Sequence, residues 1–349
     1  ASDVYKRQVP ESGKCYLKFI YHLKKELPLL DEDHILGFDE IEVSQKDAKC
    51  QLAEKWVEKT VTDSELQVSE DDTQIHIKGR EFAYTIDRRT ALFTEMKFAG
   101  REYLNHPMEL NIWRAPTDND MYIKSEWKKA HYDKAYTRAY TTEVVQGKHG
   151  VKITSHASVV AETVQKILDV TITWKIEAAG KIDADIAVTK DDEFPDLPRF
   201  GVRMFLDKKL SAVRYFGMGP QESYCDKHQA ASHGLYHANV DDLHEDYIRP
   251  QENGSHYDCE YVELNNSRYG IVVSAENAFS FNASYYTQEE LEKKTHNYEL
   301  TESDSVVFCV DYALNGIGSN SCGPVVLDQY RFDDVLFRFQ FTLIPYVKG

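Results

Sequence analysis

The sequence predicts an all-β fold, and three observations support this prediction. Apolar residues alternate with polar ones in many short stretches from residue 73 onward. The 22 tyrosines and 16 phenylalanines suit pleated sheets, whereas helix signals are few. The clearest pattern is a hairpin, in which residues 168–176 and 182–188 alternate on either side of a turn around Gly180. We therefore expect a large antiparallel β domain.

Further strands and one short helix are expected along this domain. The apolar positions that mark the strands are Ile75, Ile77, Phe82, Tyr84, Ile86, Phe200, Val202, Met204, Leu206, Phe279 and Phe281, with the apolar runs 271–273 and 335–341. The best helix signal is a capping box at residues 287–290, which predicts a helix from Thr287 to about His296. We expect His296 to interact with the C-terminal end of that helix dipole.

Three segments precede the β domain. Residues 1–8 carry no signal-peptide pattern, and we expect them to lie outside the fold. Residues 9–45 are strand-like but too short to bury a sandwich core, so we interpret them as the tail of another β domain. Residues 46–72 are charged and weakly helical, with Trp56 as their only large anchor, and we interpret them as a connector. The large β domain then spans residues 73–349.

The composition disfavours several classes of partner and site. A net charge of −17 disfavours nucleic acid and anionic membranes, and no apolar run is long enough to span a bilayer. The six cysteines form no CxxC pair, so neither a zinc site nor a disulfide framework is expected. We attribute the N-x-[ST] sequons at Asn253, Asn265 and Asn282 to chance. The compartment stays open, with the bacterial cytoplasm favoured over the periplasm.

Residues 215–258 hold a dense group of glycines, prolines, carboxylates, amides and histidines. Gly217, Gly219 and Pro220 predict a tight corner, and a second corner follows at residues 249–254. Long polar loops on a rigid sheet often carry binding chemistry. An equally weighted alternative is that these side chains only satisfy the backbone of two long loops.

The same stretch contains five histidines: His228, His233, His237, His244 and His256. Their irregular spacing gives little support for a metal site. We expect them to be solvated or hydrogen bonded.

Six short motifs follow one another along the chain. They are residues 111–120 (NIWRAPTDND) with Trp127, 198–203 (PRFGVR), 215–226 (YFGMGPQESYCD), 250–254 (PQENG), 284–287 (SYYT) and 315–324 (NGIGSNSCGP). Together they resemble the C-terminal region of family 2 glycoside hydrolases of the β-galactosidase type, over residues 9–347. The resemblance implies a galactose mutarotase-like antiparallel supersandwich over residues 73–349. It also implies that residues 9–45 form the end of an immunoglobulin-like linker domain.

The resemblance implies that catalysis lies outside this chain. In the family, the acid/base and nucleophile glutamates lie on a TIM barrel, which also binds Mg²⁺ and Na⁺. This chain lacks the alternating strands and helices that such a barrel needs over about 250 residues. We therefore expect no catalytic residue, metal ligand or cofactor here. The implied partners are the N-terminal catalytic barrel, the β-galactoside substrate of the full-length enzyme, and further copies in a homo-oligomer.

The first loop that the resemblance implies at the galactoside pocket covers residues 118–125. It corresponds to a flap at the mouth of the active site in the family. Asp118, Asn119 and Asp120 are the candidate substrate-binding residues of this loop. The alternative is a loop locked by Asx turns, with Arg114 paired internally.

The second implied loop, residues 316–324, offers Asn320, Ser321 and Cys322 as substrate-binding candidates. In one branch of the family a tryptophan in this loop stacks on the sugar, and Cys322 takes that place here. The change removes an aromatic contact of about 1 kcal/mol and leaves the preference for lactose open. Cys322 is not expected to act as a nucleophile, because no histidine lies nearby in the sequence.

The other motif residues are expected to be structural: Trp113, Arg114, Glu222, Asp226, Glu252 and Asn253. Glu222 and Asp226 could instead form a carboxylate pair, because retaining glycosidases need two carboxyls about 5 Å apart. Their spacing in an irregular loop does not establish that distance. The family assigns these two residues no catalytic role.

Three functions are compatible with these features. The first is the C-terminal part of a retaining β-galactosidase that hydrolyses terminal non-reducing β-D-galactosides. This part would contribute a wall of the pocket and assembly contacts, and would be inactive alone. The second is a stand-alone carbohydrate-binding or aldose mutarotase-like domain, with a His and a Glu or Asp facing one cleft. The third is a scaffold that only supports assembly.

Overall fold

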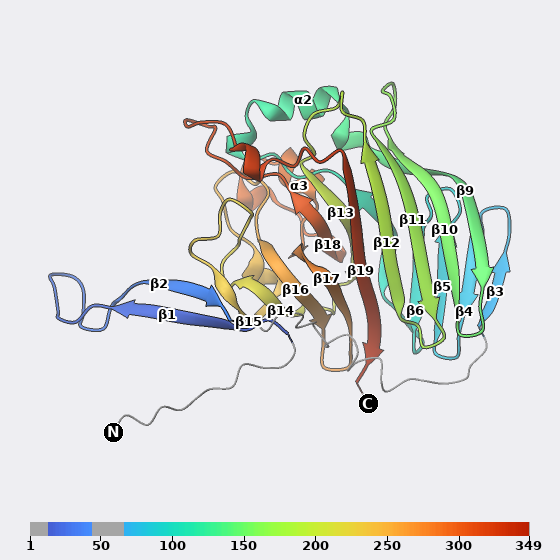
Figure 1. The fold of residues 1–349 in the computed structure, drawn as a ribbon, viewed down its shortest axis with the longest axis horizontal. Helices are drawn as coiled ribbons and strands as arrows, with labels where there is room; N and C mark the ends of the chain where they lie inside the picture. The colour runs from blue at the N-terminus through green and yellow to red at the C-terminus, as the bar shows by residue number, and fades with distance from the viewer. Residues whose placement is uncertain (1–12, 44–65, 349) are drawn as a thin grey trace. The chain divides into compact units, whose positions relative to one another are not determined.

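The computed structural model describes residues 13–43 and 66–348. The chain divides into two compact units, residues 1–55 and residues 56–349. Each unit is described by itself (Figure 1). No helix among the described residues is long and apolar enough to cross a membrane.

The first unit contains one antiparallel hairpin, formed by β1 (Tyr16–His22) and β2 (Ile35–Glu42). This agrees with the strand pattern expected in residues 9–45. Most of its side chains are exposed, including the apolar Leu17, Phe19 and Ile20. The hairpin alone does not test an immunoglobulin-like parent domain, which stays a prediction.

The second unit begins with a five-stranded antiparallel sheet whose strands follow chain order. Its strands are β3 (Gln67–Glu70), β4 (Gln74–Lys78), β5 (Phe82–Asp87), β6 (Leu92–Phe98) and β7 (Arg101–Glu102). Strand β3 lies in the segment interpreted as a connector, and it pairs with β4 through Val68 and Ile77. The rest of that segment up to residue 65, including Trp56, lies outside the described residues.

The large sheet has twelve strands, and nine of them follow the order β15-β14-β16-β17-β19-β12-β11-β10-β9. Off this path, β13 pairs with β8 and β18, and β18 also pairs with β17. The strands are β8 (Leu104–Asn111), β9 (Tyr136–Gln146), β10 (Gly150–Val160), β11 (Leu168–Glu177), β12 (Ile182–Lys190), β13 (Arg199–Asp207), β14 (Ala212–Gly219), β15 (Ser232–Asn239), β16 (Ser255–Asn265), β17 (Tyr269–Ser284), β18 (Ser305–Leu314) and β19 (Leu336–Val347). The predicted hairpin is confirmed as β11 and β12, with Ile172 opposite Ile186.

Strand β17 connects two parts of the large sheet. Its first part pairs with β19, where Val273 lies opposite Leu343. Its last part pairs with β18, where Phe281 lies opposite Val310. One long strand therefore carries the chain from the main path of the sheet into the branch formed by β8, β13 and β18.

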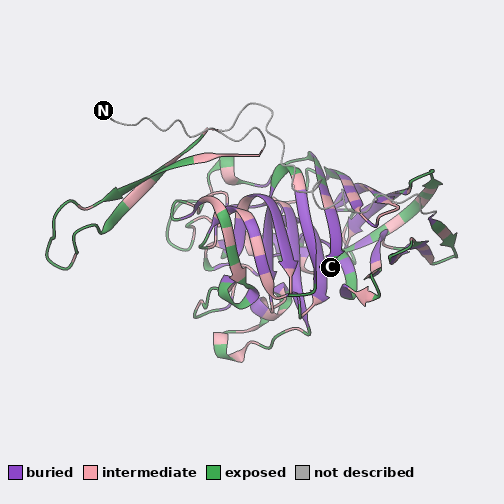
Figure 2. Cartoon of the chain, turned by 90° about the horizontal axis from the view of Figure 1, so that it is seen from below, coloured by how far each residue is buried: buried purple, intermediate pink, exposed green. Residues whose placement is uncertain are grey.

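The core lies between layers of strands. The five-stranded sheet packs against the half of the large sheet that contains β9–β12 (Figure 1). There the ring of Trp174 lies 4.9 Å from that of Phe93, and its indole N–H donates to the Ala91 carbonyl. In the other half, Phe200 of β13 packs 5.0 Å from Phe337 of β19. The central strands are accordingly buried (Figure 2). The expected all-β class and large antiparallel sheet are confirmed.

Within residues 13–43 and 66–348, two α-helices and several short 3₁₀ turns interrupt the strands. The helices are α2 (Ile123–Lys129) and α3 (Gln288–Lys293). The 3₁₀ turns are η1 (Asp118–Asp120), η2 (Tyr132–Lys134), η3 (Val240–Leu243), η4 (Asn297–Glu299) and η5 (Asp328–Tyr330).

Helix α3 begins as predicted and ends earlier. The Thr287 hydroxyl accepts a hydrogen bond from the Glu290 backbone N–H at 3.1 Å. The helix ends at Lys293, because Lys294 has an extended backbone with φ −92° and ψ 152°. His296 instead precedes the separate turn η4, where its own backbone N–H donates to Glu299. The predicted dipole role of His296 is therefore wrong.

Candidate functional site

Three segments that are far apart in the sequence meet beside α2. They are the turn η1, the corner at residues 249–254, and the loop that follows β18. The Asp118 backbone N–H donates to the Gln251 side chain at 3.1 Å, and the Asn119 side-chain amide donates to the Gly318 carbonyl at 2.7 Å. The fold thus brings together the two loops proposed from the sequence for substrate binding.

Arg114 and Asp120 form a buried ion pair beneath these loops. The guanidinium donates to both carboxylate oxygens, at 2.7 and 3.1 Å, and also to the carbonyls of Asn315 and Gly316. The same carboxylate accepts the backbone N–H of Thr117 at 2.8 Å. The internal pairing of Arg114, which was the alternative interpretation of this turn, is therefore present. It joins η1 to the start of the loop after β18.

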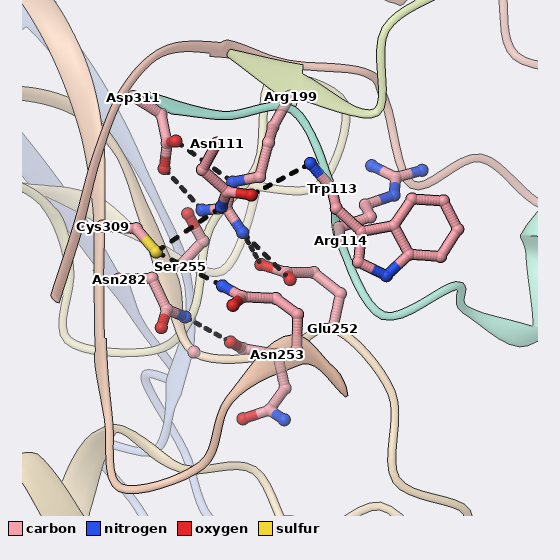
Figure 3. Close-up of polar contacts among 12 residues, drawn as sticks. Asn111, Trp113, Arg114, Arg199, Glu252, Asn253, Ser255, Asn282, Cys309 and Asp311 are labelled. Carbon is pink, nitrogen blue, oxygen red and sulfur yellow. Dashed lines mark hydrogen bonds and ion pairs between the residues drawn. The ribbon is translucent and has the colours of Figure 1, made fainter. Parts of the chain in front are cut away.

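A second buried cation, Arg199, lies between two carboxylates (Figure 3). Its guanidinium donates to Asp311 at 2.5 and 3.1 Å and to Glu252 at 3.2 and 3.4 Å. Burial raises the pKa of the Glu252 carboxyl, and the positive charges of Arg199 and Arg114 oppose this shift. We call Arg114, Asp120, Arg199, Glu252 and Asp311 the buried ionic group, because none of them is more than 4% exposed. The enclosed ion pairs of this group brace the loops, and Asp120 is its one member that also lines the cleft described below.

Glu222 and Asp226 have different partners and do not act as a pair. Glu222 accepts hydrogen bonds from the Tyr247 hydroxyl, the Lys227 ammonium and, at 2.9 Å, the backbone N–H of Gly254. Asp226 accepts the backbone N–H groups of Ile317 and Gly318, at 2.9 and 2.7 Å.

Asp226 acts together with Asn119, whose side-chain oxygen accepts the Ser321 backbone N–H at 3.3 Å. We call these two half-buried residues the loop clamp, because both bind the backbone of the loop after β18. Asn253 binds backbone too, accepting from the Glu245 N–H at 3.0 Å and donating to the Gln251 carbonyl at 2.9 Å.

A cleft of about 610 Å³ lies between η1, α2 and the segment after β18. Three of the predicted substrate-binding residues, Asn119, Asp120 and Asn320, line it. The other three do not: Asp118 is exposed and bonded to Gln251, Ser321 is exposed and bonded to Asn119, and Cys322 is exposed on the same loop.

Sequence reasoning missed the apolar part of this cleft. Met121, Tyr122 and Val325 line it, and their side chains are 43–69% exposed. The signal in the sequence is the run of apolar residues directly after the acidic turn and after Gly323-Pro324.

Helix α2 was not predicted, although its sequence offers one signal. Trp127 lies four residues after Ile123, a spacing that places both side chains on one helix face. Trp127 is fully buried, and its indole N–H donates to the Asp196 carbonyl at 2.9 Å. The helix thus anchors one wall of the cleft.

The histidines do not form a metal centre within the described residues, where no group of three or more His, Cys, Asp or Glu side chains could hold an ion. His228 stacks on Tyr257, and His233 pairs with Asp258 at 2.8 Å. His256 is buried against Phe281, and burial lowers its pKa to about 4. Five cysteines of the described chain are free thiols.

A family model and the sequences of known proteins both indicate the same family for this chain. Residues 78–343 match the family model described as "Beta galactosidase small chain". A β-galactosidase of Actinobacillus pleuropneumoniae is 43% identical over 328 residues, which cover 94% of this chain and 32% of that protein. A β-galactosidase of Staphylococcus xylosus is 32% identical over 324 residues, 93% of this chain and 32% of that protein. The chain therefore spans about a third of the length of these relatives.

The similarity of this chain to solved structures is weaker than its similarity to these sequences. The galactose 1-epimerase of Lactobacillus acidophilus NCFM aligns with 83% of this chain and 100% of its own, with a TM-score of 0.40 and 8% sequence identity.

Proposed function

This chain belongs to the β-galactosidase small-chain family, and on that premise we propose that it forms the C-terminal part of a retaining β-galactosidase. The whole enzyme would hydrolyse terminal non-reducing β-D-galactosides. The observation that carries this proposal is the family match over residues 78–343, joined by 43% identity to a named β-galactosidase across nearly the whole chain.

The contribution of this chain to the enzyme would be one wall of the galactoside pocket. The cleft beside α2 suits that role, because it combines the Asn320 amide and other polar groups with the exposed apolar side chains of Tyr122 and Val325. Sugars are bound by hydrogen bonds to their hydroxyls and by apolar contact with their C–H faces. The loop clamp would hold the wall in place, and Asn320 would face the ligand.

The catalytic carboxylates would come from a barrel outside this chain. Retaining hydrolysis needs two carboxyl groups about 5 Å apart that can reach the substrate. Glu222, Asp226 and Glu252 are each engaged by backbone or cationic donors, which suits bracing better than catalysis. Among the described residues no group of three or more His, Cys, Asp or Glu side chains could hold a metal ion, which supports placing the Mg²⁺ and Na⁺ that the resemblance implies outside this chain. We assign both ions to the barrel.

A chimeric enzyme would test this proposal. We would replace the matching third of the Actinobacillus pleuropneumoniae β-galactosidase with this chain and follow hydrolysis of a chromogenic β-galactoside. We expect turnover by the chimera and none by this chain alone. Light scattering on the chimera would show whether it assembles into a homo-oligomer. Turnover by the isolated chain would refute the proposed division of roles.

Variants in the chimera would locate the wall. Asn320→Ala should raise KM several-fold, and Cys322→Trp should lower it about fivefold if an added ring supplies about 1 kcal/mol of stacking. Asp304→Asn, at an exposed residue that pairs with His106, is the control and should leave both constants unchanged. If Asn320→Ala and Cys322→Trp both match that control while assembly still needs this chain, the scaffold interpretation would be favoured instead.

A further inference from the structure

A second hollow of about 320 Å³ lies beside the cleft, and the proposed function does not use it. The segment from residue 325 to 334 runs between the two, and Arg331 lines both. The walls of the second hollow come from β16, β17 and β18 and from this segment.

The lining of the second hollow is rich in aromatic rings. Tyr257, Tyr312, Tyr330 and Phe332 contribute to it. The Tyr312 ring is held in place by Phe337, whose ring centre lies 4.9 Å away with an interplanar angle of 15°. Polar groups lie among these rings, namely the Asp258 carboxylate, the Ser280 hydroxyl and the Gln329 amide.

A β-bulge places Asp258 at this hollow. His256 lies opposite Phe281 and Cys259 opposite Phe279, so two residues of β16 oppose Ser280 alone. Such bulges bend a strand and re-aim its side chains, and they are frequent next to functional sites. Asp258 has φ +52°, in the left-handed region where a residue with a side chain is disfavoured. Glycine adopts this conformation without steric cost, and aspartate is one of the few other residues that adopt it.

The Asp258 carboxylate is oriented by His233. The imidazole Nε2 lies 2.8 Å from Oδ2, and the side chains are 7% exposed for His233 and 28% exposed for Asp258. This contact holds the acid from one side while part of its side chain stays accessible. This differs from the carboxylates of Glu252 and Asp311 in the buried ionic group, which are at most 4% exposed and line neither hollow.

The charges of the lining indicate the class of ligand. Asp258 and Asp334 disfavour an anion, and Arg331 disfavours an amine. The lining suits a neutral sugar. Its aromatic rings can pack against the C–H face of a sugar ring, and its carboxylate, amide and hydroxyl groups can bind vicinal sugar hydroxyls. A volume near the lower limit of about 300 Å³ for ligand pockets suits one or two rings rather than a long oligosaccharide.

We propose that this hollow is a second saccharide-binding site, in which Asp258 accepts hydrogen bonds from sugar hydroxyls and Tyr312 contacts the sugar ring. The proposal needs no hydrolysis and does not depend on the function proposed above. Under this proposal, the bulge in β16 serves to place the Asp258 carboxylate in the binding site.

Ligand-observed NMR with the full chain would test it, using galactose, glucose and lactose as probes. We expect saturation transfer with at least one of them. Asp258→Asn keeps a residue that tolerates the left-handed backbone but removes the charge, and it should weaken binding at least tenfold. Asp304→Asn is the matched control, because it alters an exposed His–Asp pair that lines neither hollow.

Asp258→Gly gives a second readout that a purely structural role would not produce. It should abolish binding while keeping the melting temperature close to that of the wild type, because relief of the left-handed backbone offsets the loss of the His233 contact. A clear fall in melting temperature would assign Asp258 to the fold and overturn the proposal. The absence of saturation transfer with all three sugars would also overturn the proposal. Undiminished binding by Asp258→Asn would do the same, as would a loss of binding in Asn320→Ala, because Asn320 lines the other cleft.

Discussion

The buried ionic group and the loop clamp support the same loops in different ways. The buried ionic group places five charged side chains out of solvent, and each has an opposite charge within hydrogen-bonding distance. The loop clamp consists of half-buried side chains that bind only backbone groups of the loop after β18. Buried charges left without partners are costly, so we expect loss of the first group to destabilise the whole domain and loss of the second to release only its loop.

The largest effect on stability is expected for Arg199→Met, which tests the role of the buried ionic group. The substitution leaves the Glu252 and Asp311 carboxylates buried without their shared cation, and we expect a loss of about 3–5 kcal/mol in the free energy of unfolding. Urea unfolding followed by circular dichroism would measure it.

The control for this variant is Arg338→Met, which removes an exposed arginine that also binds a carboxylate, Asp185, with two donors. Exposed pairs contribute about 0–1 kcal/mol. If the two variants cost the same, the buried ionic group has no special role in the fold.

His256 provides a further case, because it is a buried polar residue outside both the buried ionic group and the loop clamp. His256 lies between Tyr215 and Phe281, and burial lowers its pKa from 6.5 to about 4. Between these pH values the unfolded chain binds a proton that the folded chain does not. His256 therefore makes stability fall by about 3 kcal/mol as the pH drops from above 6.5 to about 4.

The measurement is the free energy of unfolding across this pH range for the wild type and for His256→Phe. Phenylalanine keeps the ring between Tyr215 and Phe281 but does not titrate, so the pH dependence should shrink by that amount. An unchanged slope in the variant would contradict the assignment to His256.

The smallest effect on global stability is expected at the loop clamp. Asp226→Ala removes the acceptor of the Ile317 and Gly318 N–H groups. We expect less than about 2 kcal/mol of destabilisation, but at least tenfold faster hydrogen exchange at these two amides. Asp328→Ala, at an almost fully exposed carboxylate on the next segment, should leave both amides unchanged. Cooperative unfolding of the whole domain by Asp226→Ala would remove the distinction between the two groups.

Patterns that depend on neighbouring residues could be predicted from the sequence. The hairpin of β11 and β12 follows from alternation with a period of two, and the start of α3 at Thr287 follows from a capping box. The strand β15 was missed inside a segment expected to be loops. It lies at the end of the sheet order, and five of its eight residues are polar or glycine, so its apolar pattern is weak.

Partners far apart in the sequence could not be predicted. Arg199 meets Asp311 across 112 positions, and Asn119 meets Gly318 across 199. No local sequence pattern indicates such a pairing. The contacts within the buried ionic group therefore could not be predicted, although several of its members lie in the motifs quoted above. The second hollow was missed for the same reason, because its walls come from three strands and a distant segment.

The position of β19 has a consequence for how the domain folds during synthesis. This strand pairs with β12 on one side and β17 on the other, yet it follows both in the chain. Until residue 347 has left the ribosome, β12 and β17 both present an unpaired edge beside apolar side chains. Such edges are templates for pairing with other chains. The nascent domain should therefore need protection from self-association from the completion of β12 at Lys190 onward, and it should be most vulnerable just before its last described strand emerges.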